Sequence, residues 1–244
     1  MAIKLIRLSN ILKNVGKNFN IIKVGLTNCY LLKSDSCNIL IDTGYKGKAK
    51  IILDYLETNG INAKSIKLII LTHGHYDHIG NAIELKKVTG AKILIHKNEL
   101  PLLRSGVTDS QSTKPLNIWG KILLSKISSI DTTFEEIKPD IIIESEFDLN
   151  SYGIKGRIIS TPGHSKGSIS IILDSGDAFI GDLGMNGLPL RIGPGEPIFG
   201  EDISEIYKSW DKLVKNKAKS VYPSHGESFD IEVIKKILST KGLS

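Results

Sequence analysis

Short apolar runs alternate along the chain with longer segments whose apolar residues recur at helical spacing. Runs rich in β-branched residues, such as IKLIRLS at 3–9 and NIIKVG at 20–25, predict strands near the start. KLIILT at 67–72 is apolar at almost every position, so we expect this strand to be buried on both faces. The segments 48–60 and 81–90 have helical spacing and end in glycine, which commonly stops a helix. This alternation predicts a mixed α/β fold.

Residues 98–140 interrupt the alternation. NELPLLRSG, a polar stretch and IWGKILLSKISSI follow one another there, a pattern that predicts helix around a polar connection. We interpret 98–140 as a partly helical insertion that could cover a site, because long connections in compact domains are usually functional. Strand patterns return after residue 140, with helical segments at 203–216 and 231–240. Nothing in the composition divides the chain, so we expect residues 1–244 to form a single domain.

Composition and charge narrow the class of protein. Hydrophobic residues make up 41% and charged residues 24%, as in ordinary globular proteins. No apolar run approaches the roughly 20 residues of a membrane span, and the N-terminal MAIKLIRLSN lacks the continuous apolar core of a signal peptide, so we expect a cytoplasmic protein without a membrane partner. The net charge of +6 comes from dispersed lysines without interleaved aromatic residues, which argues against a nucleic-acid partner. Cys29 and Cys37 form no CxxC pair and are interpreted as packing residues.

The segment THGHYDHIG at 72–80 concentrates three of the six histidines and an aspartate. Imidazole and carboxylate groups are good ligands for zinc and similar ions. In extended backbone alternate side chains point the same way, so His73 and His75 can share one cation. The turn into the next helix can aim Asp77 and His78 at a neighbouring position. One segment could therefore serve two cations.

Four ligands do not complete two coordination spheres, so this interpretation requires further ligands at other strand ends. The sequence offers His164 in STPGHSKG, Asp182 in IGDLG and His225 in PSHG. Any one of them could instead be a hydrogen-bonded or exposed side chain, but the set of strand-end ligands in glycine-rich loops favours a metal site. His96 has no partner motif, and we expect a hydrogen bond to hold it in its strand.

The string HxHxDH at 73–78, with TPGHSKGS, FIGD and PSHG downstream, resembles the metallo-β-lactamase fold superfamily of hydrolases. The resemblance implies a four-layer αββα sandwich, with two mixed β-sheets face to face, helices outside, and metals at one edge between the sheets. It also implies two divalent metal ions, zinc in the first place with manganese or iron as alternatives. The implied ligands are His73, His75 and His164 for the first ion, Asp77, His78 and His225 for the second, and Asp182 as a bridge.

The same resemblance implies a hydrolytic reaction, in which a hydroxide bridging the two metals attacks an ester, thioester, lactone or phosphoester bond of a small substrate. Asp77 would also be catalytic, because it could orient that hydroxide or accept its proton. Asp42 in LIDTG either orients a ligand or caps a turn, and the sequence leaves both options open. The segment 184–202 is rich in Gly and Pro and is interpreted as a substrate-facing loop, with Arg191 available for an anionic group.

The sequence departs from the patterns of four known subfamilies, and each departure argues against the substrate of that subfamily. Common dizinc β-lactamases carry a cysteine where Asp182 stands, and quorum-sensing lactonases usually carry a tyrosine where this chain has Met185. The helical glutathione-holding domain of glyoxalase II and the RNA-gripping arm of ribonuclease Z have no counterpart in the sequence.

An alternative class is an oxidoreductase that resembles the persulfide dioxygenases, which share HxHxDH but hold one iron. A non-catalytic metal-binding module is a third class. The oligomeric state stays open, with a homodimer as one option.

Overall fold

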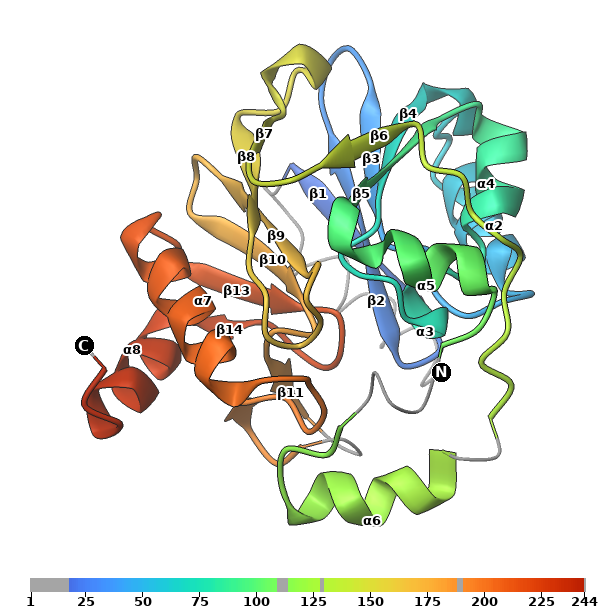
Figure 1. The fold of residues 1–244 in the computed structure, drawn as a ribbon. Coiled ribbons are helices and arrows are strands. Elements are labelled where there is room, and N and C mark those ends of the chain that lie inside the picture. Colours follow the sequence, from blue (N-terminus) through green and yellow to red (C-terminus); the bar gives the residue numbers. More distant parts are fainter. Residues whose placement is uncertain (1–17, 109–113, 128–129, 188–190, 244) are drawn as a thin grey trace, which may run out of the picture.

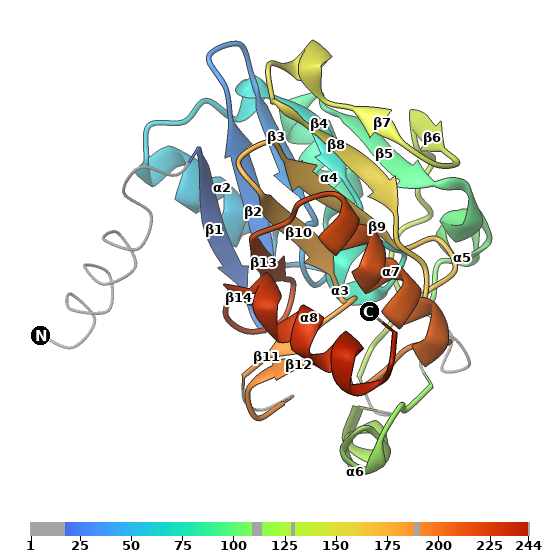
Figure 2. The same ribbon diagram turned by 90° about the vertical axis from the view of Figure 1, so that its left-hand side faces the viewer.

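The computed structural model describes residues 18–108, 114–127, 130–187 and 191–243, so the predicted strand at 3–9 and the polar stretch at 109–113 lie outside the described residues. Two six-stranded sheets form the centre of the molecule, and they face each other in Figures 1 and 2. In order across the first sheet, the strands are β1 (Phe19–Val24), β2 (Thr27–Lys33), β3 (Asn38–Ile41), β4 (Ile66–Ile70), β5 (Lys92–His96) and β6 (Ile141–Ile143). In order across the second, they are β14 (Phe229–Asp230), β13 (Ser220–Pro223), β10 (Asp177–Gly181), β9 (Ile169–Leu173), β8 (Gly156–Ser160) and β7 (Phe147–Asp148).

Both sheets are mixed, and their parallel pairs bring the site residues to one edge. β3 runs parallel to β4, and β10 runs parallel to β13, whereas β2–β3 and β9–β10 are antiparallel. Parallel neighbours end at the same edge of a sheet, where α/β proteins commonly bind ligands. Asp42 follows β3, Asp182 follows β10 and His225 comes two residues after β13, while the histidine-rich segment 72–80 follows β4.

The core between the sheets is apolar and receives side chains from both of them. Along β4, Leu68 and Ile70 point into this core, whereas Ile69 packs on the opposite face with the helices, because successive side chains of a strand alternate. All three side chains are fully buried, so the prediction of a strand buried on both faces is confirmed.

Helices cover the outer face of each sheet (Figures 1 and 2). The helices α2 (Ala49–Thr58) and α4 (Ala82–Thr89) pack on the first sheet, and α7 (Ile203–Lys215) and α8 (Ile231–Thr240) pack on the second. The largest side chain in this second outer layer is Trp210, which is fully buried and donates its indole N–H to the carbonyl oxygen of Leu183 at 2.9 Å. The four-layer αββα sandwich is therefore confirmed.

The region 98–140 contains helices among its described residues and contacts a second loop region of the chain. It includes α5 (Leu100–Ser105) and α6 (Ile118–Ile127), and α6 lies beyond the edge of the sheets at the bottom of both views. The backbone N–H of Leu116 donates to the carbonyl oxygen of Ile198 at 2.9 Å, so this region is tied to the segment 184–202. That segment folds back in a short hairpin of β11 (Met185–Asn186) and β12 (Pro194–Gly195), which the sequence pattern does not predict.

The remaining elements are short. They are α3 (Tyr76–Ile79) and the 3₁₀ turns η1 (Ala63–Ser65), η2 (Lys97–Glu99) and η4 (Asn150–Tyr152). Across the part of the chain that the structure describes, no helix combines the length and apolar character that crossing a bilayer requires.

Candidate metal centre

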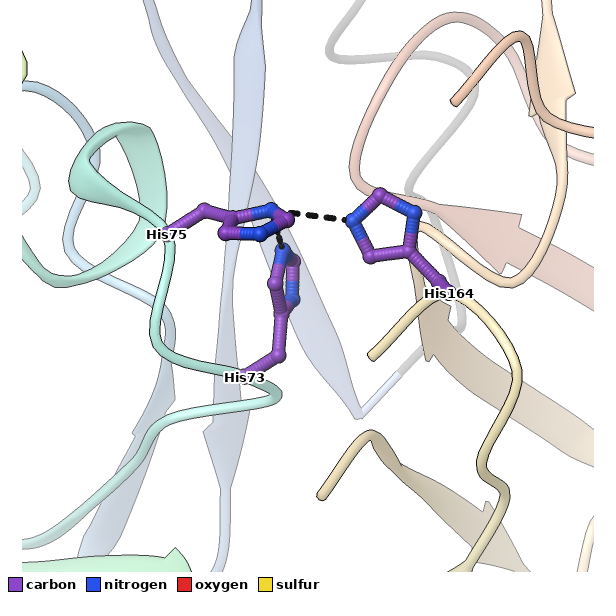
Figure 3. A group of neighbouring side chains, drawn as sticks. All are labelled: His73, His75 and His164. Carbon is purple, nitrogen blue, oxygen red and sulfur yellow. Dashed lines mark hydrogen bonds between the residues drawn. The ribbon is translucent and has the colours of Figure 1, made fainter. Parts of the chain in front are cut away.

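Three imidazoles from two distant segments meet at the edge of the sandwich (Figure 3). His73 and His75 lie on the extended segment between β4 and α3, and His164 lies on the loop between β8 and β9. His75 Nδ1 is 3.1 Å from His73 Nε2 and 3.0 Å from His164 Nε2. Nitrogens bound to one tetrahedral zinc at about 2.0–2.1 Å would lie about 3.3 Å apart. The observed spacing is close to that of ligands around a single ion.

A second group of side chains lies beside the first. Asp77 and His78 are on α3, and His225 follows β13. The Oδ2 atom of Asp77 is 3.3 Å from His225 Nε2 and 3.7 Å from His78 Nε2. These three residues have ligand atoms within 4.8 Å of one another, as do the first three. The predicted separation of Asp77 and His78 from His73 and His75 thus agrees with the geometry.

Asp182 stands between the two groups. Its Oδ2 atom lies 3.7 Å from His164 Nε2 and 3.3 Å from His225 Nε2, and its Oδ1 atom lies 3.5 Å from His78 Nε2. The sharp turn after β10 at Gly181, which has a φ of +55°, directs the following carboxylate into the site. The structure therefore brings together the seven side chains that the sequence analysis names.

Outer hydrogen bonds orient four of the imidazoles so that Nε2 faces the centre of the site. The Nδ1 atoms of His164 and His225 donate to the carbonyl oxygens of Phe199 and Leu26, each at 3.0 Å. His73 Nδ1 is 3.1 Å from the hydroxyl oxygen of Thr72. Such outer contacts fix the tautomer and the ring orientation of metal-binding histidines.

Asp42 makes the outer contact for His78. Its Oδ2 atom accepts from His78 Nδ1 at 2.8 Å and from the hydroxyl of Ser224 at 3.1 Å, and Thr72 donates its N–H and its hydroxyl to the two carboxylate oxygens at 2.8 Å. Asp42 has a φ of +58°, a backbone conformation that L-residues rarely adopt. Between the two options that the sequence leaves open, the structure shows direct contact with a site histidine.

Two buried polar atoms test whether the residues of the site fit a divalent cation. His78 Nε2 and Asp182 Oδ1 have no hydrogen-bond partner among the described residues, although both are buried. Leaving such groups unpaired is costly, because they lose their hydration without compensation. One imidazole nitrogen and one carboxylate oxygen that face a common space are suitable ligands for a divalent cation, so the residues present fit such an ion.

The charge states of the two groups differ. Burial lowers the pKa of His73, His75 and His164, with that of His75 falling to about 3, so these imidazoles are neutral and offer lone pairs. Burial also opposes protonation of His225, but the neighbouring carboxylates of Asp182 and Asp77 outweigh it and raise the pKa of His225 to about 10. Without a cation, imidazolium and carboxylate charges therefore offset one another in the second group, although His78 Nε2 and Asp182 Oδ1 share no hydrogen bond.

Glu99 is a buried residue near the site that the sequence analysis does not identify. It is 3% exposed. Its Oε2 atom accepts from the N–H of Gly74 at 2.8 Å, and its Oε1 atom accepts from the N–H of Gly167 and the hydroxyl of Ser165, each at 2.8 Å. A Cβ atom at Gly74 or Gly167 would lie within 3.0 Å of this carboxylate. Glu99 thus joins the segment of His73 and His75 to the loop of His164.

A cavity of about 120 Å³ opens over the two groups. Site residues form its floor, and Leu26, Tyr45, Tyr76, Ile130, Met185, Ile198 and Phe199 form its wall. The wall includes Ile130 from the region 98–140 and three residues of the segment 184–202. Arg191 is not among the lining residues, and its Nη1 atom donates to the carbonyl oxygen of Glu196 at 3.1 Å.

The remaining candidates lie outside the site. His96 Nε2 is 2.9 Å from the carbonyl oxygen of Glu144, and His96 Nδ1 accepts from the N–H of Asn98 at 3.2 Å, which confirms the predicted hydrogen bonding. Cys29 and Cys37 are buried free thiols, in agreement with a packing role.

The fold and the site together define a class of protein, the metallo-β-lactamase-like sandwich with a histidine and aspartate site at its edge. A family model described as the metallo-beta-lactamase superfamily matches residues 22–225. The chain is also 32% identical over 213 residues to a protein of Methanocaldococcus jannaschii named a probable metallo-hydrolase, covering 84% of this chain and 89% of the relative. The chain therefore belongs to the metallo-beta-lactamase superfamily of metal-dependent hydrolases.

Three further proteins that are similar to this chain also have names that contain beta-lactamase. The sequence is 28% identical over 232 residues to a beta-lactamase-like protein 2 homolog of Drosophila melanogaster, covering 94% of this chain and 68% of that protein. A metallo-beta-lactamase family protein of Thermus thermophilus superposes with a TM-score of 0.68 at 19% identity, covering 92% of this chain and 79% of the other. BJP-1, a subclass B3 metallo-beta-lactamase of Bradyrhizobium japonicum, superposes with a TM-score of 0.61 at 22% identity, covering 85% and 75%. At these identities the solved structures show the shared fold alone.

Proposed function

We propose that the protein is a hydrolase that uses two divalent cations, zinc in the first place, to cleave an ester, thioester, lactone or phosphoester bond of a small substrate. The observation that carries the proposal is the set of overlapping ligand groups at the sheet edge, which share His73 and His78 between neighbouring groups. A site for one cation would need only one such group. The unpaired atoms His78 Nε2 and Asp182 Oδ1 also support it, because a cation would satisfy both.

The proposed ligands follow from the distances. His73, His75 and His164 would hold the first cation, since their inward nitrogens converge from neutral imidazoles. A second ion would be held by the neighbouring group, and Asp182, which lies between the two groups, would be a ligand for both ions. The proposed ligands of the second ion are Asp77, His78 and His225.

The bound cations would lower the pKa of a shared water, so that hydroxide is available at neutral pH. The chain's own residues would do the rest. Asp77 lines the cavity, and its Oδ2 atom is held 3.3 Å from His225 Nε2, where it could orient the attacking water or accept its proton. The apolar wall of the cavity would exclude bulk water from the reacting carbonyl.

The test is a hydrolysis screen of protein loaded with zinc or manganese. The panel comprises p-nitrophenyl esters, a thioester, a simple lactone and bis-p-nitrophenyl phosphate. We expect turnover of at least one substrate that depends on added metal and is lost on chelation. If metal-loaded protein hydrolyses none of these bonds, the proposed function is wrong.

Glu99 gives a prediction about the first cation. In Glu99→Gln, an amide N–H₂ replaces one carboxylate oxygen and faces the N–H of either Gly74 or Gly167, two donors in opposition, so the two ligand segments should separate slightly. We expect the affinity for the first zinc to fall about 10- to 100-fold, as for other residues that support metal ligands from behind. Competition with a chromophoric chelator measures this affinity.

The matched control is Glu144→Gln, which changes an exposed glutamate that pairs with Lys97 at 2.7 Å. It should leave both affinities unchanged. A general loss of structure in Glu99→Gln would weaken both zinc sites, whereas a positioning role should weaken the first site selectively. Equal weakening of both sites would therefore count against this role.

A further inference from the structure

The wall of the site cavity is apolar, and none of the described residues that line it carries a cationic side chain. The side chains above the floor are those of Leu26, Tyr45, Tyr76, Ile130, Met185, Ile198 and Phe199. None of these lining residues is a lysine or an arginine. A pocket that binds a carboxylate or phosphate arm of a substrate usually provides an arginine, a lysine or a helix N-terminus for it.

Two described cations from neighbouring loops do not line the cavity and have hydrogen bonds outside it. Arg191 donates within its own loop to the carbonyl oxygen of Glu196 at 3.1 Å. The Nζ atom of Lys46, next to Tyr45 in the sequence, lies 3.1 Å from the hydroxyl oxygen of Thr133. An anionic arm packed against this wall would therefore lose its hydration without gaining a countercharge from the described wall residues.

The two tyrosines of the wall do not supply charge either. Their rings pack edge to face, with centroids 5.7 Å apart. A tyrosine hydroxyl ordinarily carries no charge at physiological pH. The tyrosines thus add aromatic surface and neutral hydroxyl groups to the wall.

The charge on the floor is better matched to the transition state than to a charged substrate. The carboxylates of Asp77 and Asp182 offset only part of the charge of two divalent cations. The remaining positive charge would stabilise the oxyanion that forms when a neutral carbonyl is attacked. A substrate that is already anionic at a second position would find no comparable partner on the wall.

We propose that the natural substrate is an uncharged carboxylic ester or thioester whose short apolar acyl group packs against Leu26, Tyr45, Tyr76 and Met185. This inference rests on the proposed function and selects one substrate class from it. The cavity is small, about 120 Å³, and limits the enclosed part of the acyl chain to a few carbon atoms. A longer acyl chain would extend past Ile130 and Leu26. Both of these residues are partly exposed, at 41% and 51%.

The test uses two esters of similar length that differ in charge. The neutral ester is p-nitrophenyl pentanoate, and the anionic ester is p-nitrophenyl hydrogen succinate. For metal-loaded protein we expect kcat/KM to be at least about 10-fold higher for the neutral ester, a difference of about 1.4 kcal/mol. In metal-free protein, saturation transfer in NMR should reach the acyl protons of methyl pentanoate and not those of monomethyl succinate.

A variant tests the role of the wall. Leu26→Lys adds a cation at a half-exposed wall position, and it should raise the relative kcat/KM for the succinate ester several-fold. The matched control is Ile142→Lys on β6, because Ile142 is also 51% exposed and does not line the cavity. The control should keep the wild-type preference for the neutral ester.

Failure of this substrate inference can be distinguished from failure of the proposed hydrolase function. If metal-loaded protein prefers the succinate ester, or cleaves only bis-p-nitrophenyl phosphate, this inference is wrong and the proposed hydrolase function stands. If metal-loaded protein cleaves no ester, thioester, lactone or phosphoester, the proposed function fails and the inference fails with it.

Discussion

Asp182→Asn is expected to lower kcat/KM by about 1,000-fold or more for any substrate that the metal-loaded protein cleaves. The Asp182 carboxylate lies between the two ligand groups, and its oxygens lie 3.3–3.7 Å from three imidazole nitrogens. An asparagine keeps the shape but removes the charge that would bind both cations. A loss of about 4 kcal/mol of transition-state stabilisation corresponds to this factor. Steady-state kinetics together with metal content per chain measures both effects.

The matched control is Asp177→Asn at the opposite end of the same strand, β10. Asp177 accepts a hydrogen bond from Ser175 at 2.6 Å and has no contact with the site groups. This variant should keep wild-type kinetics and metal content. Full activity of Asp182→Asn with normal metal content would remove the bridging role.

Removal of bound metal should abolish hydrolysis, and addition of zinc or manganese should restore it. The described structure shows no other use for the five imidazoles and two carboxylates at the sheet edge. Chelation should therefore lower the rate of hydrolysis by about 1,000-fold or more. The metal-free chain should also unfold at a lower temperature. Binding to the native state alone would stabilise it by about 2.7 kcal/mol at a metal concentration of 100 times the Kd.

Differential scanning calorimetry across a zinc titration measures the stabilisation, and activity recovered after chelation and reconstitution measures the catalytic effect. A variant without His73, His75 and His164, each replaced by Ala, is the control, since its unfolding temperature should respond much less to zinc. Undiminished activity after complete metal removal, verified by elemental analysis, would show that catalysis does not need the cations.

Long elements with a strong hydrophobic pattern could be predicted from the sequence. The helix at 48–60 and the strand at 67–72 correspond to α2 and β4, because their patterns extend over enough residues to be distinctive. The pairs β11–β12 and β13–β14 involve strands as short as two residues, which carry no periodicity. Their pairing depends on where distant segments meet in the fold.

The convergence of the site side chains could be predicted because the segment 72–80 and the residues His164, Asp182 and His225 all come after strands, in stretches that contain glycine. The residues that support these side chains and those that form the cavity wall above them could not be predicted. Glu99 lies 25 residues from Gly74 and 68 from Gly167, and two of its three partners are the backbone N–H groups of these glycines, which leave no mark on the sequence. The cavity wall similarly combines residues from several separate segments, so its apolar character is visible only after folding.

The most direct test of the central claim is the anomalous diffraction signal of crystals grown with excess zinc, recorded on both sides of the zinc absorption edge. Our account predicts two zinc ions in each chain. One should lie among His73, His75 and His164, the other among Asp77, His78 and His225, and Asp182 should contact both. A single bound iron held by the first group, or an empty site with these side chains turned apart, would contradict the account.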